Sequence, residues 1–95
     1  MRVQFIDKAN GPERLVCDAE VLFDEGTPLA GMKLVGFSIW RTAEGELSVT
    51  FPSRAFGLAT ERRFFDFVRS IEGNAADGRR VKDWLLEEYR VARAA

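Results

Sequence analysis

Residues 33–54 carry the clearest pattern in the chain, because apolar and polar side chains alternate there on both sides of a polar turn. A period of two residues is typical of strands that place one face on a core. The pattern therefore predicts a β-hairpin with one apolar face. The residues expected on that face are Val35, Phe37 and Ile39 before the turn and Leu47, Val49 and Phe51 after it.

The limits of this hairpin are marked by turn-forming residues. Residues 42–45 are expected to form the turn, since Gly45 can adopt the positive φ that such turns require. Pro52 should end the second strand, because proline has no amide hydrogen to donate to a neighbouring strand.

Two shorter alternating segments precede the hairpin. Residues 2–8 are predicted to form a strand with Val3 and Phe5 on one face. Residues 15–23 are predicted to form a second strand. Its inward-facing residues are expected to be Leu15, Cys17, Ala19, Val21 and Phe23.

The segments that follow the hairpin are less regular. Residues 53–61 show no clear period and are expected to form an exposed loop. Residues 63–71 fit two interpretations, which the residues alone leave open. Phe64, Phe67, Val68 and Ile71 have helical spacing, whereas Phe65, Phe67 and Ile71 would share one face of a strand.

The last segment predicts a helix over residues 79–94. Its apolar stripe consists of Val81, Trp84, Leu85, Tyr89 and Ala92. Residues 73–78 read as a linker in which Asn74 and Asp77 are candidate N-caps. The predicted fold class is therefore α+β: a mostly antiparallel, meander-like sheet of about five strands, with one C-terminal helix packed on it.

Composition narrows the class of protein. The chain has 95 residues, which is the size of one domain, 1–95. Its 46% hydrophobic and 31% charged content is that of an ordinary soluble globular protein. We expect no signal peptide and no membrane helix, because no apolar stretch approaches ~20 residues. A cytoplasmic location is expected, and the single cysteine, Cys17, is expected to be buried and inert.

The sequence contains no histidine. This excludes Ser-His and Cys-His nucleophilic pairs and removes the commonest metal ligand. A zinc site would have to combine carboxylates with one thiol, an unusual ligand set. We therefore predict that the protein is not an enzyme and that it holds no metal or cofactor.

Charge is unevenly distributed along the chain. The net charge is −1, but residues 1–53 carry five basic against eight acidic residues, and residues 54–95 carry nine against seven. Whole-chain charge alone does not indicate nucleic-acid binding. The basic excess lies in the second half.

Two motifs resemble the SpoVG family, the stage V sporulation protein G family of septation regulators. The first is LSVTFPSR at residues 47–54, similar to a family strand that runs into Pro-Ser and a basic residue. The second is FFDFVRSI at residues 64–71, similar to the family's aromatic strand before the helix. The resemblance implies an antiparallel sheet with a C-terminal helix and resolves residues 63–71 as a strand. It also implies a homodimer that binds nucleic acid, DNA or RNA, and acts as a regulator.

Six basic residues are the candidate phosphate contacts. Arg54 follows Pro-Ser at a strand end, where its guanidinium could meet a phosphate in a forked geometry. The alternative for each residue is a solvated charge, and for those that open the helix a carboxylate partner such as Asp77 or Asp83. The full set is Arg54, Arg62, Arg63, Arg79, Arg80 and Lys82.

A protein–protein interaction module is the competing hypothesis. It would present a free sheet edge or the Trp40 face to a partner. Trp40 lies on the strand face opposite Phe37, where it could stack on a base or be covered by a dimer interface or by the terminal helix.

Overall fold

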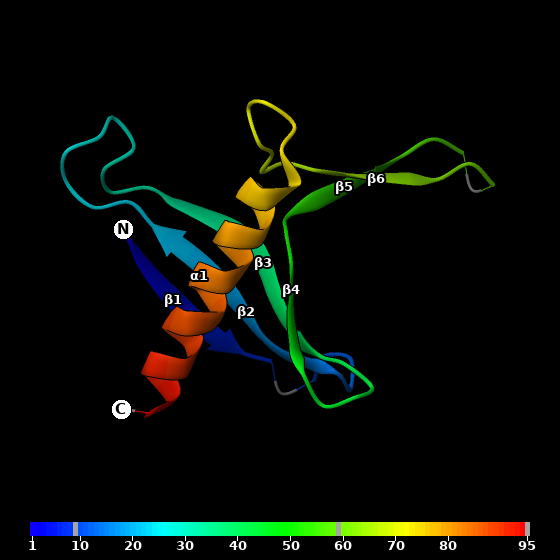
Figure 1. The fold of residues 1–95 in the computed structure, drawn as a ribbon, viewed down its shortest axis with the longest axis horizontal. Coiled ribbons are helices and arrows are strands. Elements are labelled where there is room, and N and C mark those ends of the chain that lie inside the picture. Colours follow the sequence, from blue (N-terminus) through cyan, green and yellow to red (C-terminus); the bar gives the residue numbers. More distant parts are fainter. Residues whose placement is uncertain (9, 59, 95) are drawn as a thin grey trace.

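The computed structural model describes residues 1–8, 10–58 and 60–94, and this part of the chain forms six strands and one helix (Figure 1). Strands β1 to β4 form an antiparallel sheet in sequence order, and β5 pairs with β6 in a second sheet. The predicted α+β class is confirmed, but the strands form two sheets instead of one. The elements are β1 (Arg2–Asp7), β2 (Leu15–Leu22), β3 (Lys33–Arg41), β4 (Leu47–Thr50), β5 (Ser53–Phe56), β6 (Arg63–Asp66) and α1 (Ala75–Ala94).

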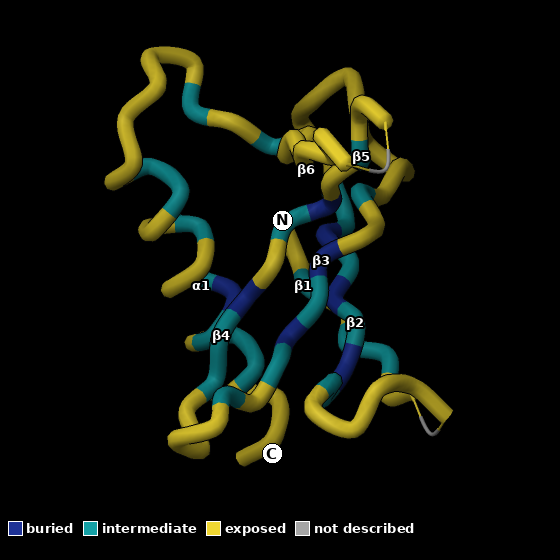
Figure 2. Tube along the Cα trace, turned by 90° about the vertical axis from the view of Figure 1, so that its right-hand side faces the viewer, coloured by how far each residue is buried: buried dark blue, intermediate teal, exposed yellow. Residues whose placement is uncertain are grey.

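The core lies between the four-stranded sheet and α1, which covers one face of that sheet (Figure 1). Phe5 of β1 meets Tyr89 of α1 edge to face, with ring centroids 5.4 Å apart. Figure 2 shows the buried positions gathered along β2, β3 and β4 and at one point of α1. The buried apolar residues are Cys17, Ala19, Val21, Phe37, Ile39, Val49 and Leu85.

A bulge in β3 corrects the predicted facing of the hairpin. Ala19 pairs with Phe37 and Val21 pairs with Leu34, so Val35 and Gly36 together oppose a single residue of β2. Because one extra residue reverses the alternation, Leu34 packs against the core and Val35 is 50% exposed. The prediction that Val35 faces the core was wrong, whereas those for Phe37 and Ile39 are confirmed.

Helix α1 begins earlier than predicted, at Ala75. Asn74 is the N-cap, since its Oδ1 accepts a hydrogen bond from the Ala76 amide at 2.9 Å. Asp77 lies inside the first turn, so its prediction as the cap was wrong. The apolar stripe is confirmed at Leu85, which is buried, whereas Ala92 is exposed.

Residues 53–66, which we call the arm, stand away from the rest of the molecule (Figure 1). The prediction of a loop over residues 53–61 was wrong for Ser53–Phe56, which form β5, whereas the predicted exposure is confirmed for all the described residues of this segment except the partly buried Ala55. Ala59 lies outside the described residues. The strand implied by the resemblance is found at β6, and it ends at Asp66. Within the part of the arm that the structure describes, no residue is buried, as Figure 2 shows.

The remaining predictions concern the outer face of the sheet and the membrane. Trp40 is half-buried, and its Nε1 donates a hydrogen bond to Thr50 Oγ1 on the neighbouring strand at 2.9 Å. Among the described residues, no helix combines the length and the apolar character that crossing a bilayer requires.

Candidate nucleic-acid interface

The two strands of the arm sort its side chains onto two faces. Residues directly opposite each other in an antiparallel pair share a face, and Arg54 pairs with Phe65 while Phe56 pairs with Arg63. These four residues therefore form one face, which we call the Arg/Phe face. The opposite face carries Ser53, Ala55, Phe64 and Asp66.

On the Arg/Phe face, arginines and aromatic rings alternate across the two strands. The Arg54 guanidinium lies 5.0 Å from the centroid of the Phe56 ring, a cation–π contact. Phe56 and Phe65 meet edge to face at 5.3 Å. A shallow hollow of about 280 Å³ lies on this face and is lined by Phe56, Phe65 and Arg69.

The arginines of this region differ from many other cations of the chain in having no acidic partner. Within the described part of the chain, Arg54, Arg62, Arg63 and Arg69 form no ion pair. Their charges are thus not neutralised by the protein itself. Six other cations are paired: Arg2 with Asp24, Lys8 with Asp18, Lys33 with Glu20, Arg80 with Asp77, Arg90 with Glu87 and Arg93 with Asp7.

The structure brings three of the six predicted residues onto the arm. Arg54 lies in β5, Arg63 opens β6, and Arg62 directly precedes it. Arg62 and Arg63 line a second shallow hollow, together with Thr60 and Glu61.

The other three predicted residues lie on the first half of α1, away from the outer end of the arm (Figure 1). Arg80 Nη1 lies 2.9 Å from the carboxylate of Asp77, and Lys82 Nζ lies 5.3 Å from the centroid of the Phe51 ring. Arg79 is exposed. Within one chain, the six residues therefore form two groups instead of one patch.

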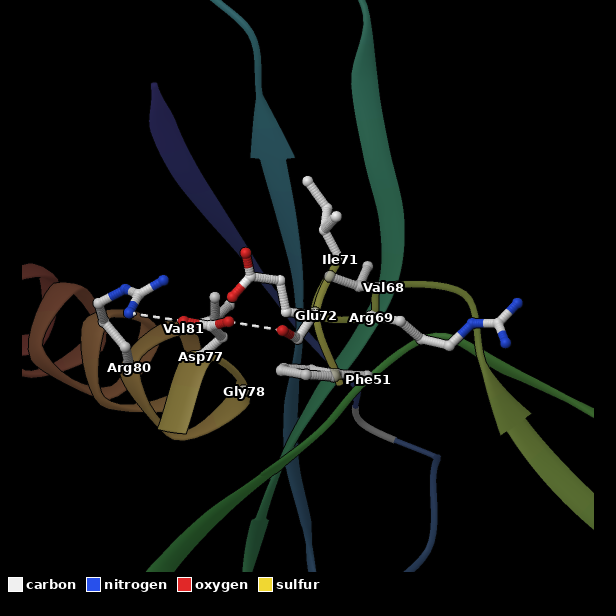
Figure 3. Close-up of a pocket in the computed structure, with 10 residues that line it drawn as sticks. Phe51, Val68, Arg69, Ile71, Glu72, Asp77, Gly78, Arg80 and Val81 are labelled. Carbon is white, nitrogen blue, oxygen red and sulfur yellow. Dashed lines mark hydrogen bonds and ion pairs between the residues drawn. The ribbon is translucent and has the colours of Figure 1, made fainter. Parts of the chain in front are cut away.

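A third hollow, of about 410 Å³, opens at the start of α1 (Figure 3). Its wall includes Phe51, Val68 and Val81 and two acidic residues, Glu72 and Asp77. Asp77 accepts a hydrogen bond from Ser70 and pairs with Arg80. These hydrogen bonds, that from Ser70 first, lower the pKa of Asp77 below its usual value.

Figure 3 also shows that the side chain of Arg69 points away from the hollow at the start of α1 and toward the arm. This orientation explains how Arg69 reaches the rings of Phe56 and Phe65 on the Arg/Phe face. Arg69 thus extends the basic surface of the arm toward the body of the molecule.

Because the chain has no histidine, nucleophilic attack and metal binding would depend on its cysteine and its carboxylates. Cys17 is fully buried, and burial raises the pKa of its thiol, which favours the unreactive protonated form. No group of three or more Cys, Asp or Glu side chains in the described ranges could hold a metal ion.

The sequence analysis did not single out Phe56, Phe65 or Arg69 as site residues. A usable signal was nevertheless present, because SRAF at 53–56 and RFFD at 63–66 place an arginine two residues from a phenylalanine in each segment. Recognising that the two segments pair would have placed these side chains on one face.

No protein-family model matches this chain, and no curated protein or solved structure is significantly similar to it. Evidence about its function therefore comes from its own residues.

Proposed function

We propose that this protein is a non-enzymatic, cytoplasmic nucleic-acid-binding regulator of the SpoVG kind, which contacts phosphates mainly with the arginines of the arm. The observation that carries the proposal is the group of unpaired arginines on and beside the arm: Arg54, Arg62, Arg63 and Arg69. A guanidinium presents forked donors that match the geometry of a phosphate. A two-stranded ribbon that stands clear of the body can approach a nucleic-acid backbone without obstruction.

The charge distribution supports the same surface. Residues 53–69 carry four arginines against Glu61 and Asp66, a net charge of +2, so the rest of the chain carries −3. A positive arm on a negative body attracts a polyanion to the arm and repels it from the body. This separation explains how a chain with a net charge of −1 can bind nucleic acid.

Replacing Arg54 and Arg63 together by Ala should weaken binding to every oligonucleotide tested. Each lost phosphate contact should make the slope of log K against log salt shallower by about 0.9 on duplex DNA or about 0.7 on a single strand. Fluorescence anisotropy titrations at four salt concentrations measure both quantities. Thermal unfolding should be unchanged, because both side chains are exposed.

The matched control is the double variant Arg2→Ala and Arg90→Ala. It removes the same charge from two exposed arginines that are paired with Asp24 and Glu87. This variant should bind with nearly the salt slope of the unaltered protein. Equal losses in both double variants would contradict a contact at the arm and would indicate a response to net charge alone.

A second role, self-association, is favoured by the apolar side chains that the arm exposes. An isolated two-stranded hairpin is marginally stable in water. The two strands of the arm pack much more on each other than on the four-stranded sheet or on α1. A second copy that covers the face of Phe64 would stabilise the arm and form the homodimer that the resemblance implies. The exposed apolar residues on and near the arm are Phe56, Leu58, Phe64, Phe65, Phe67 and Ile71.

This self-association predicts a mass of about twice 10.7 kDa by light scattering at tens of micromolar protein. Phe64→Asp should shift the mass to that of one chain, because Phe64 is 70% exposed on the face opposite the arginines. The control is Leu29→Asp, at an apolar side chain exposed in the loop between β2 and β3. A single-chain mass for the unaltered protein would refute the dimer.

A further inference from the structure

We propose that the Arg/Phe face binds single-stranded nucleic acid, with an unpaired base seated in the hollow lined by Phe56, Phe65 and Arg69. The proposal rests on the proposed function and adds the state of the strand that is bound. In this proposal, the phenylalanine rings stack on bases and the neighbouring arginines contact phosphates.

The size and walls of the hollow match a single flat group. Its volume of about 280 Å³ lies just below the ~300–1,000 Å³ of ordinary small-molecule pockets. Two of its lining residues are phenylalanines, each 44% exposed, and the third is Arg69. Both kinds of group stack on the face of a nucleobase.

The part of a base that can reach these rings decides whether the bound nucleic acid is single-stranded or double-stranded. In a duplex, each base is stacked between its neighbours, and only its edges are open to a protein. The faces of the bases are reachable only in a single strand or an unpaired loop. Phenylalanine rings also have no donor or acceptor with which to read a base edge, so binding should tolerate different sequences.

The charges beside the hollow suit the backbone of the same strand. Arg54 lies over the ring of Phe56 and is paired opposite Phe65, and Arg63 is paired opposite Phe56. Each ring therefore has an arginine as a neighbour. Asp66, the carboxylate within the strands of the arm, lies on the opposite face, where it pairs with Ser53. The face therefore offers stacking surfaces and cations without a nearby strand carboxylate that would repel phosphates.

The test compares two probes, a fluorescein-labelled 20-nucleotide oligo(dT) and a 20-base-pair duplex of mixed sequence. Phe56→Leu and Phe65→Leu remove a ring but retain an apolar side chain, and Leu29→Ala is the control, at an apolar side chain exposed in the loop between β2 and β3. We expect the unaltered protein to prefer oligo(dT). Each ring variant should weaken oligo(dT) binding by about tenfold or more and leave duplex binding and the salt slope unchanged.

Three results would overturn the proposal. The first is equal affinity for the two probes, and the second is unaltered oligo(dT) binding by both ring variants. In either case, a loss of binding in the Arg54 and Arg63 double variant would still support the proposed function. If the unaltered protein bound neither probe, both the proposed function and the single-strand proposal would be refuted. The third is a lower mass of the ring variants by light scattering, which would place a second copy, not a nucleic acid, on this face.

Discussion

Replacing Phe37 by Ala is expected to destabilise the protein by roughly 3–5 kcal/mol, the usual cost of removing a buried aromatic side chain. Phe37 is 1% exposed and meets the ring of Phe51 edge to face, with centroids 5.6 Å apart. Only Pro52 separates Phe51 from the arm, so this contact lies next to the point where the arm leaves the body. Urea unfolding followed by circular dichroism measures the change in the free energy of unfolding.

Val35→Ala is the matched control for this prediction. Both residues lie in β3 and both were predicted to face the core, but the bulge leaves Val35 half exposed. Its truncation should change the free energy of unfolding by no more than about 0.5 kcal/mol. If the two variants unfolded at the same urea concentration, the bulge in β3 would be absent in solution.

Replacing Gly36 by Ala should produce the second large effect. Gly36 has φ of 106°, a conformation that costs a residue with a side chain about 1–3 kcal/mol. An added Cβ would also lie 2.7 Å from Cβ of Pro52, which is too close for two carbon atoms. The loss of stability should therefore exceed the cost of the backbone conformation alone.

The control is Gly26→Ala, since Gly26 has a similar φ of 98° and no heavy atom within 4 Å of the added Cβ. The difference between the two variants in the free energy of unfolding isolates the contact with Pro52. Pro52 joins β4 to the arm, so Gly36→Ala should also alter oligonucleotide binding, whereas Gly26→Ala should not. Equal behaviour of the two variants would show that this contact has no effect.

The parts of the fold that sequence analysis predicted correctly are those where burial imposes a period. Most of β1 to β4 places apolar residues on the core at every second position, and α1 does so at helical spacing. The alternation is interrupted by register shifts near Val16 in β2 and at Val35 and Gly36 in β3. The bulge in β3 escaped prediction because it interrupts the alternation at Gly36, which has φ of 106°.

In the arm, burial imposes no period on the sequence. Strand β5 is four residues long and has no buried residue, so its sequence carries no signature of burial. Its structure is determined by pairing with β6, and a period-based analysis of either segment alone cannot detect that pairing.

The candidate site was predictable to a similar extent. The position of Arg54 after Pro-Ser and the adjacent pair Arg62 and Arg63 were visible in the sequence, and all three lie on the arm. The role of Arg69 depends on the direction of its side chain after β6 has ended, which only the structure shows. For the basic residues at the start of α1, the sequence left open a phosphate or a carboxylate partner, and in the structure Arg80 pairs with Asp77.

The sequence-order arrangement of β1 to β4 has a consequence for the kinetics of folding. Each of these strands pairs only with its neighbours along the chain, so the sheet can grow by successive closures of short loops. Contacts of this local kind are associated with fast folding. The pairing of Asp7 with Arg93 and the edge-to-face contact of Phe5 with Tyr89 join opposite ends of the chain. We therefore expect the docking of α1 onto β1 to be the late, slow event, after the sheet has formed.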